Sequence, residues 1–145
     1  MAGSLGSCDN WFATTQSQVS SHYGVGLKGE AHQYVSLENT SWANGRLEEG
    51  NIWQRRFGSD NPNDETITIE TEDKGKGTQP VTDEQFATTL ALCRRAIAAG
   101  NAGMVLSGHV AISPRTRPGC PGARWVASGR MEQLARELNI PLYLP

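Results

Sequence analysis

The sequence predicts a single α/β domain in which helices flank a mixed central β-sheet. Residues 65–73, ETITIETED, alternate polar and apolar side chains, which is typical of a strand. Residues 81–101, VTDEQFATTLALCRRAIAAGN, carry apolar side chains at helical spacing. The chain has 145 residues, which is enough for one domain with a real core and too few for two. We therefore interpret residues 1–145 as one domain.

The composition excludes several classes of function. A net charge of -2 gives no electrostatic attraction to nucleic acid or to anionic membranes. No apolar run approaches the roughly 20 residues of a membrane span, and the N-terminus lacks the basic and apolar parts of a signal peptide. The 3 cysteines are an odd number, which does not suggest a disulfide framework. We expect a monomer with no nucleic-acid partner and no membrane insertion.

The first half of the chain predicts a helix, a hairpin and a long loop. Ser7 is placed to cap a helix over CDNWFATTQS, with Trp11 and Phe12 on its buried side. The stretch SHYGVGLKGEAHQYVSL indicates two strands around an LKGE turn, where Gly29 can take the positive φ that a hairpin needs. Residues 38–64 form a longer connection than most, and its aromatic side chains favour an ordered loop that faces substrate.

The second half predicts a strand, a helix, a short strand and a last helix. In the first of these helices, Thr82 and Gln85 form a capping box. The stretch GMVLSGH predicts a short buried strand that ends at His109, and residues 125–139 predict the last helix. The apolar stripe of the first helix consists of Phe86, Leu90, Cys93 and Ile97.

His109 and Cys120 form the first candidate site. A neutral imidazole and a thiolate are both good zinc ligands, and proline-stiffened turns between them can bring the two side chains together. The alternative is a strand-end histidine and an unrelated buried thiol. Spacing alone favours that alternative, because a catalytic zinc site usually takes three ligands from the protein.

The other candidate residues also have ordinary structural interpretations. Glu70, on the polar face of its strand, is either a general base or a solvated glutamate. Arg115 and Arg117 either contact a carbonyl or an acidic substrate, or are simply solvated. Trp42 and Trp53 either stack on sugar rings or anchor their loop in the core. The two histidines of the hairpin strands fit hydrogen-bonded structural roles better than ligand roles.

Three stretches carry a resemblance in their order along the chain: SSHYGVGLKGEAHQYVSLENTSWANG, NDETITIE and GHVAISP followed by CPG. They resemble the zinc-dependent N-acetylmuramoyl-L-alanine amidases, a family that includes phage endolysins and peptidoglycan-recognition proteins. The first stretch is similar to the family's hairpin and Trp-x-x-Gly loop. The second is similar to its Asn-x-x-(Ser/Thr)-Ile-Gly-Ile-Glu strand, and the third to its Gly-His-x-x-Ile-x-Pro segment. The resemblance covers about residues 2–135.

The resemblance implies an enzyme that uses Zn²⁺ to hydrolyse the amide between N-acetylmuramic acid and L-alanine in peptidoglycan. It makes His109 and Cys120 zinc ligands and Glu70 the base that takes a proton from water. Arg117 would help to hold the developing oxyanion. The substrate-binding residues that it implies are Trp42, Asn44 and Trp53.

The chain departs from the family's pattern at three places. Pro118 stands where many members have a lysine, and Ser21 where phage members have a catalytic tyrosine. Met1 falls where the family's opening strand should end in its first zinc-binding histidine. The resemblance thus implies a domain truncated at its N-terminus, without that strand and that ligand. His22 lies on the wrong face of its strand to substitute.

Two functions of different classes follow from this pattern. One is an active peptidoglycan hydrolase, which the retained Glu70 and Cys120 favour. The other is a catalytically impaired or inactive peptidoglycan-binding module, which the absent histidine favours. Among the family's roles we expect an endolysin, which stays in the cytoplasm until it is released to the cell wall. An α/β domain unrelated to the family is a third interpretation, because short motifs also occur by chance.

Overall fold

The computed structural model describes residues 3–74, 77–100 and 103–145. Three short stretches therefore lie outside the described residues, and Met1 is in the first of them. The elements are, in chain order, α1 (Leu5–Phe12), β1 (Tyr23–Val25), β2 (Ala31–Gln33), α2 (Trp53–Phe57), the 3₁₀ helix η1 (Pro62–Glu65), β3 (Ile69–Thr71), α3 (Asp83–Ala99), β4 (Leu106–Ser107), the 3₁₀ helix η2 (His109–Ala111), α4 (Ala123–Val126), α5 (Arg130–Leu138) and β5 (Leu142–Tyr143).

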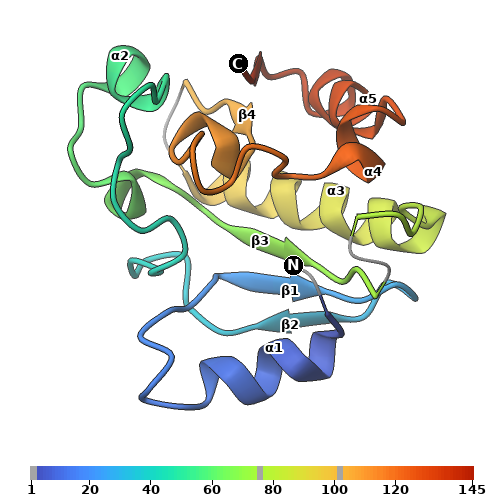
Figure 1. Ribbon diagram of the computed structural model, residues 1–145. Coiled ribbons are helices and arrows are strands. Elements are labelled where there is room, and N and C mark those ends of the chain that lie inside the picture. Colours follow the sequence, from blue (N-terminus) through green and yellow to red (C-terminus); the bar gives the residue numbers. More distant parts are fainter. Residues whose placement is uncertain (1–2, 75–76, 101–102) are drawn as a thin grey trace.

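β1 is the central strand of a three-stranded sheet with the order β2-β1-β3 (Figure 1). It runs antiparallel to β2 and parallel to β3, so the predicted mixed sheet is confirmed. The register places Gly24 of β1 opposite Glu70 of β3. β4, the short strand that the sequence predicted before His109, forms a separate parallel pair with β5, which the sequence did not predict. A two-residue strand such as β5 is too short to show an alternating pattern.

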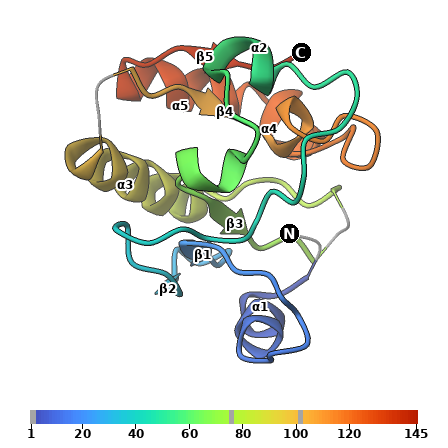
Figure 2. The same ribbon diagram turned by 90° about the vertical axis from the view of Figure 1, so that its left-hand side faces the viewer.

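Helices cover both faces of the three-stranded sheet. Figures 1 and 2 show α1 on one side of it and α3, with α4 and α5 beyond, on the other. A Cβ at Gly24 would lie 2.7 Å from the Leu5 side chain of α1, so the lack of a side chain here lets α1 pack closely. The main core lies between α3, α4 and α5. It consists of Val81, Phe86, Leu90, Trp125, Met131 and Leu134.

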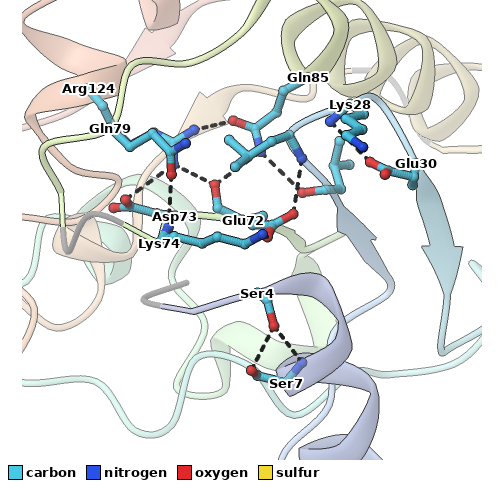
Figure 3. Close-up of polar contacts among 12 residues, drawn as sticks. Ser4, Ser7, Lys28, Glu30, Glu72, Asp73, Lys74, Gln79, Gln85 and Arg124 are labelled. Atoms are coloured by element: carbon cyan, nitrogen blue, oxygen red, sulfur yellow. Dashed lines mark hydrogen bonds and ion pairs between the residues drawn. The ribbon is translucent and has the colours of Figure 1, made fainter.

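The helix α1 begins earlier than the sequence predicted. Ser4, rather than Ser7, is its N-cap, and the Ser4 hydroxyl accepts the Ser7 main-chain N–H at 3.1 Å (Figure 3). The buried side chains of the helix are Leu5 and Cys8, which lie one turn apart on one face. The prediction that Trp11 faces the core is wrong, because its side chain is 54 % exposed.

The helix α3 is the element that the sequence predicted best, although half of its capping box is wrong. Thr82 caps it and accepts the Gln85 N–H at 3.0 Å, as predicted. The Gln85 side chain does not return to Thr82 but donates to the carbonyls of Val25 at 3.2 Å and Glu72 at 3.1 Å. The buried Arg124 guanidinium binds the Gln85 amide oxygen and the Glu72 carbonyl (Figure 3). This network ties α3 and α4 to the ends of β1 and β3.

Two further predictions concern turns. The hairpin is confirmed: Gly29 has a φ of 83°, and Gly26 N–H donates to the Glu30 carbonyl at 2.8 Å. The predicted last helix is instead two helices, α4 and α5, because Gly129 adopts a φ of 73° between them.

In the part of the chain that the structure describes, no helix has the length and apolarity needed to span a bilayer.

Candidate active site

His109 and Cys120 lie next to each other at the end of β4. The Val110 N–H donates to the Cys120 carbonyl oxygen at 3.4 Å, and the His109 main chain lies close enough to the Cys120 thiol to lower its pKa. Gly108 makes this approach possible, because a Cβ at that position would lie 2.8 Å from the Cys120 carbonyl oxygen. The strand end and the CPG turn are therefore packed main chain against main chain.

The His109 ring is oriented by a single main-chain contact. Its Nε2 lies 3.0 Å from the Asn44 carbonyl oxygen. A carbonyl can only accept a hydrogen bond, so Nε2 carries the proton and Nδ1 keeps its lone pair. This is the arrangement by which metal-binding histidines fix the nitrogen that faces the ion.

Burial raises the pKa of the Cys120 thiol, and the His109 N–H partly offsets that effect. The carboxylate of Glu70 raises this pKa further. These three residues also line one cavity of about 280 Å³ between β3 and β4. The two predicted ligands are therefore adjacent, and the predicted base lines the same cavity.

An open cleft of about 1210 Å³ adjoins this cavity, and His109 lines both. Trp42 stands at the cleft and is 58 % exposed. Its main-chain N–H donates to the Ser20 hydroxyl at 3.0 Å, which fixes the backbone that carries the indole. An exposed and anchored aromatic side chain of this kind suits contact with a sugar or peptide.

Asn44 and Trp53 are placed differently from Trp42. Trp53 is 5 % exposed, packs against Ala111 and Ile112, and donates from Nε1 to Glu65 at 3.3 Å. Asn44 is 6 % exposed, and its side-chain amide donates to the Thr66 hydroxyl at 2.7 Å. Both side chains hold the loop together, and the one link from Asn44 to His109 is its main-chain carbonyl.

Arg117 is exposed on the wall of the open cleft. Its N–H donates to the Ser113 carbonyl at 2.8 Å, while Arg115 pairs with Glu49 at 3.1 Å. The sequence interpretation gave Glu48 no role. Its carboxylate accepts the Arg115 N–H at 2.8 Å and the Thr116 N–H at 3.1 Å. The Glu48 carboxylate therefore sets the course of the loop that carries Arg117.

His22 has a structural role, as the sequence predicted. Its ring is 1 % exposed, Nδ1 accepts the Thr68 N–H at 3.1 Å, and Nε2 donates to the Asn39 carbonyl at 3.0 Å. Both ring nitrogens are occupied, so His22 has no lone pair to offer a metal.

The donor chemistry of His109 and Cys120 fits zinc, but only as part of a site. Within the described ranges, no three histidine, cysteine, aspartate or glutamate side chains gather closely enough to hold a metal ion. Zinc is usually four-coordinate, so two coordination positions remain beyond these two side chains.

Asn63 is a further residue of the site that sequence reasoning missed. It is 4 % exposed, and its side-chain oxygen accepts the Asn44 N–H at 2.9 Å. The resemblance of NDETITIE to the family's strand includes this asparagine but gives it no role. Its partner lies 19 residues earlier in the chain, and no short-range pattern reports such a contact.

Comparisons with known proteins support the resemblance. The family model of N-acetylmuramoyl-L-alanine amidases matches residues 1–123. A selenomethionine derivative of AmpD is 28% identical, with a TM-score of 0.58, over 80% of this chain and 59% of that one. The complex of the E. coli amidase AmiD with anhydro-N-acetylmuramic acid-L-Ala-D-γ-Glu-L-Lys is 24% identical, with a TM-score of 0.69, over 99% of this chain and 56% of that one.

The chain therefore spans less than two thirds of the length of either solved relative. A comparison with curated proteins gives no significant match.

Proposed function

Because this chain belongs to the N-acetylmuramoyl-L-alanine amidase family, we propose that it hydrolyses the amide between N-acetylmuramic acid and L-alanine in peptidoglycan. One observation carries the proposal. His109, Cys120 and Glu70 line the same cavity, and that cavity adjoins an open cleft of about 1210 Å³. We further propose that residues 1–145 act as one domain and as a monomer, in the role of an endolysin.

His109, through Nδ1, and Cys120, through its thiolate, are the residues that would hold zinc. When bound, zinc supplies Lewis-acid polarisation of the scissile carbonyl. The hydrogen bond from His109 to the Asn44 carbonyl holds the imidazole in the tautomer that this role needs.

Glu70 is the proposed base. It accepts a proton from the attacking water and passes that proton to the nitrogen of the leaving L-alanine. Arg117, on the cleft wall, would donate hydrogen bonds to the carbonyl oxygen as negative charge develops there. Trp42 would stack against the glycan or the stem peptide.

A peptidoglycan-binding module without hydrolysis is the second candidate. The described residues favour it in one respect, because they offer two zinc ligands rather than three. The open cleft and Trp42 would serve binding equally well in both cases.

Incubation of purified cell wall with the protein and zinc separates the two candidates. An amidase exposes new L-alanine amino groups, which amine labelling and mass spectrometry of the released peptides detect. Glu70→Gln is the matched control, because it removes the base while keeping a polar side chain of similar size. Sedimentation of the protein with the wall, without any new amino group, would favour the binding module. Neither binding nor release would contradict both.

A further inference from the structure

The peptide unit between Asn44 and Gly45 carries the contact that orients His109. The Asn44 carbonyl oxygen of this unit accepts the hydrogen bond from His109 Nε2 at 3.0 Å. Gly45 has a φ of 65°, a left-handed conformation that glycine adopts without strain. The direction of this one carbonyl therefore decides which ring nitrogen of His109 is protonated.

Asn63 holds the main chain on both sides of that peptide unit. Its Oδ1 accepts the Asn44 N–H at 2.9 Å, and its Nδ2 donates to the Gly45 carbonyl at 3.2 Å. The Asn44 carbonyl lies between these two anchored groups. One amide side chain thus fixes the backbone before and after the carbonyl that His109 uses.

Asn63 is itself held in place. It is 4 % exposed, and its Nδ2 also donates to the Asn61 side-chain oxygen at 3.1 Å. A buried amide with its donor and acceptor groups paired has little rotational freedom. The orientation of the Asn63 side-chain amide is therefore fixed before any ligand binds.

We propose that Asn63 is a positioning residue for the metal site: by holding residues 44 and 45, it keeps His109 protonated on Nε2 with Nδ1 free to bind zinc. The expected effect on zinc binding rests on the proposed function, whereas the tautomer of His109 is a property of the metal-free protein. Groups that orient metal-binding histidines typically contribute 10–100-fold to metal affinity.

Thr66 provides a matched control in the same network. Its hydroxyl accepts the Asn44 side-chain amide at 2.7 Å and donates to the Pro62 carbonyl at 2.9 Å, so it holds the Asn44 side chain rather than the main chain of residues 44 and 45. Thr66→Val therefore loosens the Asn44 side chain, and Asn63→Ala loosens the main chain. If Asn63 only stabilised the loop, both variants would lower stability and neither would change the His109 ring.

The experiment measures ring-nitrogen chemical shifts of His109 in the metal-free protein and the zinc dissociation constant by chelator competition. We expect the Nε2–H tautomer in the wild type and in Thr66→Val. Asn63→Ala should show a mixture of tautomers and bind zinc about 10-fold or more weakly. Asn63→Ser, which keeps a small polar side chain in the buried site, is the milder variant if Asn63→Ala does not fold, and it should lie in between.

An unchanged tautomer together with zinc affinity within twofold of the wild type, in a folded Asn63 variant, would overturn the inference. So would a Thr66→Val variant that loses as much affinity as Asn63→Ala. A wild-type protein that binds no zinc would count against the proposed function instead, and the tautomer comparison would still decide the role of Asn63.

Discussion

The histidines show how hydrogen bonding decides what a residue can do. His22 has a partner on each ring nitrogen and is buried in the hairpin. His109 makes its hydrogen bond through Nε2, beside the open cleft. His32 pairs through Nδ1 with the partly exposed Asp9 at 2.8 Å. Of these side chains, His109 has the geometry that suits a metal ligand.

At this scale, the stability of the protein should depend on the protonation of His22. Burial lowers its pKa below the ordinary 6.5, although its hydrogen bond to Asn39 acts in the opposite direction. In the unfolded chain His22 takes up a proton near pH 6.5, while in the folded chain it does so only at lower pH. Its contribution to stability is therefore complete above that pH and is lost as the pH falls.

Denaturant unfolding between pH 7 and pH 5 tests this dependence on His22. The free energy of unfolding should fall with pH in the wild type, and less steeply in His22→Asn. Identical slopes for His22→Asn and the wild type would refute the assignment.

Trp42 should contribute to substrate binding rather than to the reaction. For Trp42→Ala we expect KM to rise about tenfold with kcat nearly unchanged, because a stacking side chain binds ground state and transition state alike. Trp11→Ala is the control, since Trp11 is also exposed but belongs to α1 and does not line the cleft. A fall in kcat with unchanged KM would place Trp42 in the chemistry instead.

At the scale of elements, the site depends on how closely the end of β4 packs against the CPG turn. Gly108 faces the Cys120 carbonyl oxygen and the Pro121 ring, so the two segments touch through their backbones. Gly119 lies in the same turn, but a Cβ there would meet nothing within 4 Å. Replacing each of these two glycines with alanine therefore tests the packing, with Gly119 as the control.

Gly108→Ala should push the turn away from β4 and separate His109 from Cys120. We expect a loss of roughly 1–3 kcal/mol in the free energy of unfolding, as for other overpacked sites. Zinc affinity should also fall about tenfold or more. Gly119→Ala should change stability by less than about 0.5 kcal/mol. Denaturant unfolding and chelator competition measure both effects, and equal behaviour of the two variants would contradict the packing argument.

The elements also show what the sequence could predict. α3 was predictable because its cap and its apolar stripe are local. α2 has only five residues inside a polar loop, so its periodicity is too brief to detect. Ser4 and Ser7 are both residue types that cap helices, so the local sequence does not distinguish between them.

At the scale of the whole molecule, the candidate site joins parts of the chain that are far apart. His109 and Cys120 follow β4, Glu70 lies on β3, and the Asn44 carbonyl comes from the long loop. Spacing alone favoured an unrelated histidine and thiol, and only the family resemblance brought these residues together in the sequence interpretation. The hydrogen bonds from Asn63 to residues 44 and 45 are tertiary contacts, so the sequence alone could not predict them.

The most direct test is a crystal structure of the protein grown with zinc, with anomalous scattering recorded at the zinc absorption edge. Our account predicts one strong peak bonded to His109 Nδ1 at about 2.0 Å and to Cys120 Sγ at about 2.3 Å. No peak at saturating zinc, a peak bonded through His109 Nε2, or a peak only at another site would contradict it.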